Sequence, residues 1–422
     1  MQIAARVDRV MLRISLLTGG GDRPYVMGLG RTLIEQGIGL EIIGSNELES
    51  PEWRSKPHVQ FLNLRGDQNP GANVRVKILR VLKYYAALLR YAWRANPGIF
   101  HILWNNKFET VDRTFLMLYY KGLGKRVVLT AHNVNKRKRD GVDSFFNRLT
   151  LKTQYRLCDH IFVHTEPMKS ELVKEFGCRD SAVTVIPFGI NDAVPQTPIT
   201  TREAKVRLGI RNEERTILFF GRIVPYKGLD YLVTAFQTLL ARSPNYRLII
   251  AGRPDNDSKH YCRTIQGQIV EAGISEYVLQ RIEFVPDAET EVYFKAADVL
   301  VLPYRQIYQS GVLFLAYSFG LPVIATRVGG LPDEIKEGET GYVCRPDSSD
   351  DLTVVIERFF EGELYHTLES RRSRIREYAR QRYSWQLVGQ RTRAVYGALL
   401  GPSMAHSELY PAHLKGDPGP DQ

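Results

Sequence analysis

The chain has 422 residues, of which 44% are hydrophobic and 24% charged, and this composition is typical of a globular protein with two domains. It contains no run of the ~18 apolar residues that a transmembrane helix needs, no signal peptide at its start, and no metal-ligand spacing among its four cysteines, so we expect a reduced, cytoplasmic protein. The net charge of +11 favours anionic partners such as nucleotides, lipid head groups or nucleic acid, without choosing among them.

Apolar runs that read as buried strands alternate with helical periodicity along nearly the whole chain. The first half has such runs at 12–17, 40–43, 59–64, 99–103, 127–130, 160–163 and 183–186. The second half has them at 216–220, 247–251, 282–285, 299–302 and 323–325. This alternation predicts an α/β protein with two doubly wound, Rossmann-like domains, each built on a parallel sheet.

Glycine and proline cluster after residue 185, where the periodicity lapses, and this places the domain boundary at 190/191. The predicted domains are therefore 11–190 and 191–383, followed by a helix at 384–400. The polar segment 401–422, rich in Pro and Gly, is predicted to be a disordered tail. Because ligands of such sheets bind beyond the carboxyl ends of the strands, the useful loops should follow strands and face a cleft.

Residues 73–95 contain no acidic side chain and form a basic amphipathic helix by their periodicity. One stripe consists of Val74, Ile78, Val81, Tyr85, Leu88 and Ala92, and the opposite side carries Arg75, Arg80, Lys83, Arg90 and Arg94. Two interpretations stay open: the helix lies on an anionic membrane, or it packs on the core with a solvated basic face. The basic run 135–139 likewise either steers an anionic acceptor or is simply exposed.

Two loops after strands of the second half have the composition of an anion site. Gly221 lets the backbone approach a ligand closely, Arg222 offers a planar fork for phosphate oxygens, and Lys227 adds a second positive charge. The segment 309–312 opens a helix, whose free amides and positive end favour a phosphate, although Ser310 is equally suited to cap the helix.

The order strand, loop, helix, strand over 302–334, together with G-R-x-x-x-x-K-G at 221–228, resembles the donor-binding segment of GT-B glycosyltransferases, retaining family 4 in particular. The resemblance implies an acceptor domain at 11–190, a nucleotide-sugar domain at 191–383, and a helix at 384–400 that braces the first domain. It implies a retaining hexosyltransferase that uses a nucleotide-diphosphate sugar without metal or cofactor. The implied acceptor is a glycan or a lipid-linked molecule in cell-surface polysaccharide or glycolipid synthesis, at the inner face of a membrane.

The resemblance also assigns roles to individual residues. The donor diphosphate would be held by Gly20, Gly21, Gly221, Arg222, Lys227, Ser310, Gly311 and Val312. His132, at the end of the strand 127–130, would donate a hydrogen bond to a sugar hydroxyl or to the leaving group, so His132, Arg222 and Lys227 are the expected catalytic residues.

The family's two glutamates, eight positions apart, are absent: aligned on Pro303 and Gly320, their positions hold Ile307 and Leu315. Neither side chain can hold a sugar hydroxyl or a ribose, although Gln306 or Gln309 lies close enough in sequence to form a hydrogen bond with the sugar. Three readings stay open: an active enzyme with an altered sugar pocket, a donor-binding protein with poor turnover, and a non-catalytic partner subunit. A nucleotide-sugar epimerase of GT-B shape is a further alternative, whereas nucleic acid is not expected because no recognition motif is present.

Overall fold

The computed structural model describes residues 12–69, 71–190 and 194–401 and contains two parallel sheets. The seven-stranded sheet has the order β3-β2-β1-β4-β5-β6-β7 and the six-stranded sheet the order β10-β9-β8-β11-β12-β13. The first sheet consists of β1 (Arg13–Leu17), β2 (Gly39–Gly44), β3 (Val59–Asn63), β4 (Ile99–Ile102), β5 (Arg126–Thr130), β6 (His160–Val163) and β7 (Val183–Val185). The second consists of β8 (Arg215–Phe220), β9 (Tyr246–Ala251), β10 (Val278–Arg281), β11 (Val299–Leu302), β12 (Val323–Thr326) and β13 (Gly341–Cys344).

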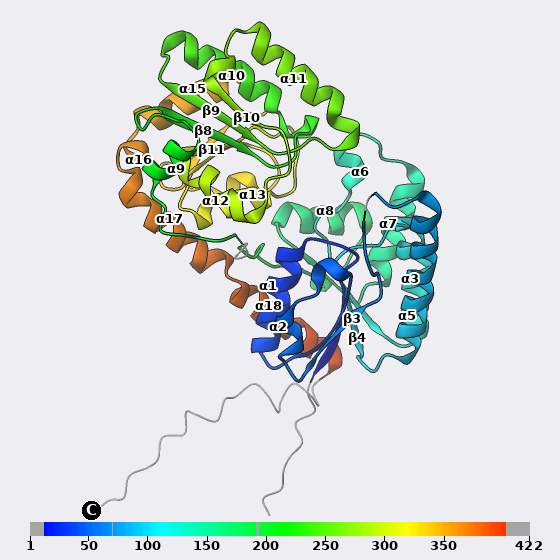
Figure 1. Cartoon of the computed structure of the whole chain (residues 1–422). Coiled ribbons are helices and arrows are strands. Elements are labelled where there is room, and N and C mark those ends of the chain that lie inside the picture. The colour runs from blue at the N-terminus through cyan, green and yellow to red at the C-terminus, as the bar shows by residue number, and fades with distance from the viewer. Residues whose placement is uncertain (1–11, 70, 191–193, 402–422) are drawn as a thin grey trace, which may run out of the picture.

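Helices cover both faces of each sheet, because the central strands are buried along their whole length and need apolar cover on either side (Figure 1). The first domain has α1 (Arg23–Glu35), α2 (Pro51–Arg54), α3 (Val74–Arg94), α4 (Glu109–Val111), the π-helical η2 (Asp112–Leu116), α5 (Met117–Gly122), α6 (Lys136–Arg139), α7 (Phe145–Leu157) and α8 (Glu166–Phe176). The second has α9 (Thr201–Arg207), η4 (Pro225–Lys227), α10 (Leu229–Arg242), α11 (Lys259–Glu271), α12 (Asp287–Ala296), α13 (Gly311–Ser318), α14 (Leu331–Glu334), α15 (Ser349–Glu361), α16 (Glu363–His366) and α17 (Leu368–Tyr383). The prediction of two Rossmann-like domains is therefore confirmed.

The last helix, α18 (Trp385–Leu400), packs against α1 of the first domain (Figure 1). Contact is close because Gly28 faces the Trp385 ring: a Cβ at Gly28 would lie 2.0 Å from it. Further along α18, the Tyr396 hydroxyl lies 2.6 Å from Nδ1 of the buried His101. The chain thus returns from the second domain to complete the core of the first.

Two predictions about the second sheet need correction. The strand expected at 282–285 lies four residues earlier, as β10, and Phe284 is exposed. β10 is an edge strand that contains the polar residues Gln280 and Arg281, so its sequence is not an apolar run. β13, at the other edge, was not predicted as a strand at all, because its run is short and begins with Gly341. The predicted disordered tail lies outside the described residues apart from Gly401.

The amphipathic helix predicted at 73–95 is α3, and its two ends have different environments. Leu88 and Ala92 are buried in the core of the first domain. Val74 and Ile78, on the same predicted stripe, are 67% and 56% exposed. Core packing therefore explains only the second half of the stripe, and the first half stays free for another partner.

Candidate functional site

A cavity of about 420 Å³ lies between the two domains, at the carboxyl ends of both sheets. The first domain contributes residues that follow β1, β4, β5 and β7, and the second contributes residues that follow β8 and β11. Trp385, at the start of α18, completes the wall. The cleft expected from the alternation of strands and helices is therefore present, and the loops that line it follow strands.

Lys227 is the buried cation of this cavity, with 7% of its surface exposed. Burial, together with the nearby charges of Arg222 and Arg139, lowers the pKa of Lys227 from 10.5 to about 7. Within the described part of the chain, its ammonium group has no carboxylate partner and lies over the ring of Tyr304. A buried cation without a counter-ion is a ready binding partner for an anion.

Arg222 also lines the cavity, but it is exposed and pairs with Asp255 at 3.0 Å. Exposed ion pairs of this kind contribute ~0–1 kcal/mol, so the guanidinium can exchange Asp255 for a stronger anion at little cost. Gly221 has φ of +104°, and a Cβ there would lie 2.9 Å from Nζ of Lys227. The backbone conformation at 221 therefore favours glycine, which also leaves space beside the lysine.

The helix α13 begins at the cavity with Ser310, Gly311 and Val312 on its wall. Ser310 does not cap the helix: its hydroxyl lies 3.1 Å from the Tyr304 hydroxyl instead. The amides of Gly311 and Val312 have no acceptor among the described residues. The helix end therefore presents unpaired N–H groups to the cavity, beside Lys227.

The positions of the two missing acids also face the cavity. Ile307 and Leu315 line it and are otherwise buried, at 9% and 7% exposure. Gln309, between them in the sequence, lines the same cavity, and its Nε2 is buried without a hydrogen-bond partner in the described chain. This part of the cavity is thus apolar, with one amide whose donor is free.

His132 lines the first-domain side, as predicted, and stacks on the Trp104 ring at 4.1 Å between centroids. Its Nδ1 lies 3.1 Å from Nε2 of His164, whose Nδ1 lies 3.3 Å from the Ile186 carbonyl oxygen. Burial lowers the pKa of both histidines, that of His164 to about 4, so both rings are neutral.

The partners fix the tautomers of these rings. A carbonyl only accepts, so His164 carries its proton on Nδ1 and its Nε2 accepts from His132. The single proton of His132 is then on Nδ1, and Nε2 is a hydrogen-bond acceptor without a partner in the described structure. The sequence predicted that His132 donates a hydrogen bond to the ligand, whereas this network leaves its Nε2 as an acceptor.

Gly20 and Gly21, which were predicted to hold the diphosphate, are not among the residues that line the cavity. The Trp104 ring covers Gly21, where a Cβ would lie 2.0 Å from it, and the Arg65 guanidinium covers Gly20. The residues just after them, including Asp22 and Tyr25, reach the wall instead. The glycines provide room for side chains from other loops, which the local sequence could not reveal.

One cation of the cavity was not singled out from the sequence. Arg139, the last residue of α6, lies with its guanidinium carbon 4.3 Å above the Tyr226 ring of the other domain. Arg139 belongs to the basic run 135–139, and only the fold shows which member of this run reaches the cleft. Among the described residues, no group of three His, Cys, Asp or Glu side chains could hold a metal ion. The cationic side chains on the wall of this cavity are Arg139, Arg222 and Lys227.

Two family models match successive parts of the chain. One described as "Glycosyltransferase Family 4" covers residues 19–194, and one described as "Glycosyl transferases group 1" covers residues 200–382. A D-inositol 3-phosphate glycosyltransferase of Corynebacterium efficiens is 25% identical over 77% of this chain and 78% of its own length. One of Kribbella flavida is 24% identical over 92% and 96%.

Solved structures share the whole architecture. Sucrose-phosphate synthase of Thermosynechococcus elongatus has a TM-score of 0.73 at 19% identity, over 92% of this chain and 99% of its own. Anabaena HepE in complex with UDP and glucose has a TM-score of 0.71 at 16% identity, over 92% and 100%. The chain is therefore a glycosyltransferase of the GT-B fold, of the group 1 and family 4 type.

Proposed function

We propose that the chain transfers a sugar from a nucleotide-diphosphate sugar, with retention, to an acceptor bound on the first domain. The observation that carries the proposal is the meeting of Lys227, Arg222 and the unpaired amides of α13 at one cavity. A diphosphate matches this set in charge and in hydrogen-bond acceptors. The similar fold of HepE, described in complex with UDP and glucose, supports the same placement of the donor.

In the proposed reaction an acceptor hydroxyl attacks the anomeric carbon on the face from which the diphosphate leaves. The bond between that carbon and the phosphate oxygen breaks, and a phosphate oxygen takes the acceptor's proton. Negative charge grows on the diphosphate, where Lys227, Arg222 and the α13 amides stabilise it without a metal ion. His132, through Nε2, accepts a hydrogen bond from a sugar hydroxyl and holds the ring in place.

The apolar pair Ile307 and Leu315 leaves Gln309 as the polar contact of the sugar pocket on α13's side. In this proposal the free Nε2 of Gln309 donates to a sugar hydroxyl. A neutral amide holds such a hydroxyl less strongly than a carboxylate would, since hydrogen bonds to charged groups are about twice as strong.

The test is a panel of UDP-, GDP- and ADP-sugars, measured for binding and for turnover. We expect one donor to bind, and Arg222→Ala to reduce turnover by about 10²-fold or more, the usual loss when one charge-stabilising group is removed. Arg374→Ala, an exposed arginine on α17 outside the cavity, is the matched control. Binding without turnover would indicate a non-catalytic subunit, and no binding together with an unaffected Arg222→Ala would refute the proposal.

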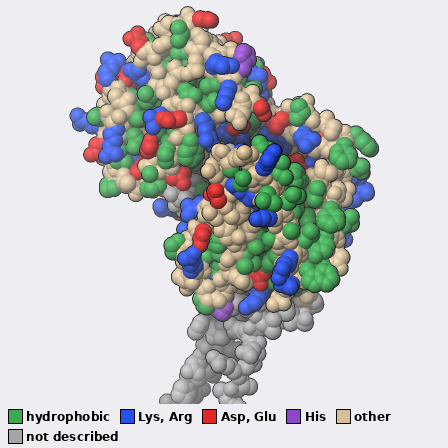
Figure 2. Space-filling view, turned by 45° about the vertical axis from the view of Figure 1, so that its right-hand side comes forward, with side chains coloured by type: hydrophobic (Ala, Val, Ile, Leu, Met, Phe, Trp, Pro, Cys, Tyr) green, Lys and Arg blue, Asp and Glu red, His purple; other side chains and the backbone are tan. Residues whose placement is uncertain are grey.

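We further propose that the first domain rests on an anionic membrane through one exposed apolar surface. This surface comprises Val74, Ile78, Leu79, Leu82, Phe115, Leu118, Phe145, Phe146 and Leu149, from α3, η2, α5 and α7. Figure 2 shows hydrophobic side chains gathered over this side of the lower lobe, with Lys and Arg side chains near them. No helix of the described residues is long and apolar enough to cross a membrane.

Exposure this large argues for a partner, since Phe145 is 83% and Phe146 59% exposed. The exposed cations Arg75, Lys83 and Arg90 on α3 favour an anionic surface as that partner. We expect the protein to sediment with vesicles that contain phosphatidylglycerol, less so at high salt, because salt screens the exposed charges.

The double substitution Phe145→Ser and Phe146→Ser should abolish most of this sedimentation. Phe284→Ser removes a phenylalanine from the second domain that is 62% exposed, close to the value for Phe146, and should have no effect. A wild-type protein that stays in solution with anionic vesicles at low salt would eliminate the membrane proposal.

A further inference from the structure

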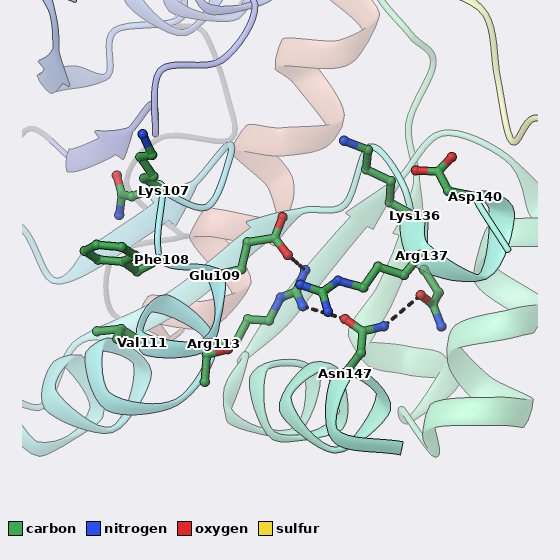
Figure 3. Close-up of a pocket in the computed structure, with 12 residues that line it drawn as sticks. Lys107, Phe108, Glu109, Val111, Arg113, Lys136, Arg137, Asp140 and Asn147 are labelled. Carbon is green, nitrogen blue, oxygen red and sulfur yellow. Dashed lines mark hydrogen bonds and ion pairs between the residues drawn. The ribbon is translucent and has the colours of Figure 1, made fainter. Parts of the chain in front are cut away.

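A second cavity, of about 580 Å³, lies in the first domain beside the cleft (Figure 3). Its walls are the segment 106–113, which follows β4, and the segment 135–147, which follows β5. The short helix α6 separates the two cavities: Lys136 and Arg137 line the second cavity, whereas Arg139 lines the cleft. A molecule in the second cavity would therefore lie next to the place proposed for sugar transfer.

Cations outnumber acids on the walls of this cavity. The cations are Lys107, Arg113, Lys136 and Arg137, and the acids are Glu109 and Asp140. Both acids already have partners, Arg113 at 2.8 Å and Arg139 at 2.8 Å. Within the described residues, the side chains of Lys107, Lys136 and Arg137 have no carboxylate partner. The cavity therefore has positive charge to offer to an anionic ligand.

Arg113 is the best-ordered cation on the wall of this cavity, because it is only 9% exposed and its side chain has fixed partners. It donates to Oδ1 of Asn147 at 2.9 Å and pairs with Glu109. Asn147 is itself fixed, since its amide nitrogen donates to Asn135 and Asp143 at 3.0 and 2.7 Å. The Nε of Arg113 is buried without a hydrogen-bond partner in the described structure.

Figure 3 shows Arg137 extending across the cavity toward Arg113. Glu109 compensates the charge of Arg113, whereas Arg137 has no carboxylate partner among the described residues, so the two guanidinium groups together keep one positive charge for an anion. A phosphate can accept from both, with the planar two-donor geometry that guanidinium groups prefer. Neither residue takes part in the donor site described above.

We propose that this cavity binds a phosphate group of the acceptor. The inference rests on the proposed glycosyl transfer, because it adds an acceptor to the first domain at the edge of the cleft. Phe108 and Val111, also on its wall, are exposed and connect the cavity to Phe115 of the apolar surface. The phosphate therefore belongs either to a soluble sugar or polyol phosphate or to a membrane lipid, and the chemistry recognised is the same.

The experiment is a calorimetric titration of the full chain with the donor cavity first saturated with UDP or GDP. One arm titrates glycerol 3-phosphate against glycerol as the uncharged control. The other arm measures sedimentation with phosphatidylcholine vesicles that contain phosphatidic acid. Binding of glycerol 3-phosphate assigns a soluble phosphate ester. Sedimentation with phosphatidic acid that Arg137→Ala reduces, without binding of glycerol 3-phosphate, assigns a lipid.

Arg137→Ala should weaken phosphate binding at least about tenfold, the usual effect of losing one charge-assisted hydrogen bond, and leave nucleotide binding unchanged. Arg156→Ala removes an exposed arginine from α7 of the same domain and should bind phosphate as the wild type does. Equal binding by wild type and Arg137→Ala, or no phosphate binding by a wild type that binds nucleotide, would overturn the inference alone. Phosphate binding that depends on Arg137 in a protein that binds no nucleotide would instead refute the proposed transfer and keep the anion site.

Discussion

Donor affinity should depend on pH through Lys227. Burial, and then the nearby charges of Arg222 and Arg139, lower the pKa of its ammonium group to about 7. A bound diphosphate favours the protonated form, so binding raises the pKa of Lys227 and takes up a proton. Affinity is then greatest below pH 7 and is lost as the pH rises through the pKa of the free protein.

The size of the effect follows from the protonated fraction. With a pKa of about 7, Lys227 is about half protonated at pH 7 and about one tenth protonated at pH 8. If only the charged form binds tightly, the apparent affinity should fall about fivefold between pH 7 and 8 and about tenfold between pH 8 and 9. Loss of the charge altogether should cost about 1.5–3 kcal/mol of binding free energy, the range for a charge-assisted hydrogen bond.

Calorimetric titration of UDP or GDP across this pH range measures the dependence, and buffers with different ionisation enthalpies reveal the proton uptake. Lys227→Met should bind about 10- to 100-fold more weakly at pH 7 and show no such pH dependence. The ratio of the affinities of the wild type and Lys227→Met at each pH is independent of the titration of the nucleotide itself. A wild-type affinity that stays constant from pH 7 to 9 would refute the argument.

Two further predictions concern histidines of the first domain. His164→Phe removes the acceptor that fixes the tautomer of His132, so we expect kcat to fall by ~10²-fold with little change in nucleotide affinity. His164→Gln keeps a hydrogen-bond acceptor and should retain most of the activity. Equal kcat values for the two variants would show that the tautomer of His132 has no part in the mechanism. Tyr396→Phe leaves Nδ1 of the buried His101 without its partner, so we expect the free energy of unfolding to fall by ~1–3 kcal/mol in chemical denaturation. An unchanged midpoint and slope of the unfolding curve would show that this contact of helix α18 does not stabilise the fold.

The sequence predicted the parts of the fold that leave a strong local pattern. Fully apolar strands such as β4 and β11 were located because both faces are covered, which makes the whole run hydrophobic. β10 was misplaced because an edge strand exposes polar side chains, as Gln280 and Arg281 do. The cleft followed from topology, since parallel strands direct their carboxyl ends to one edge.

The sequence predicted those site residues whose position follows from the backbone of their own loop. It did not predict properties of the site that depend on side chains far away in the sequence. Lys227, Ser310 and Gly311 lie on the cavity because their loops follow strands directly. The environment of Gly20 depends on Arg65, and the polarity of His132 depends on His164. These are contacts between loops far apart in sequence, for which a single chain carries no local signal.

The two crossings between the domains lie side by side. Ile190, at the first crossing, donates its amide to the Tyr383 carbonyl at 3.1 Å and accepts from Nε1 of Trp385 at 2.7 Å, at the second. Two connections tied together in this way form one axis, and sliding or twisting of the domains would strain both connections at once. Rotation about this axis is the motion that strains the two connections least, and it would change the separation of Arg139 and Lys227 on the two sides of the cleft.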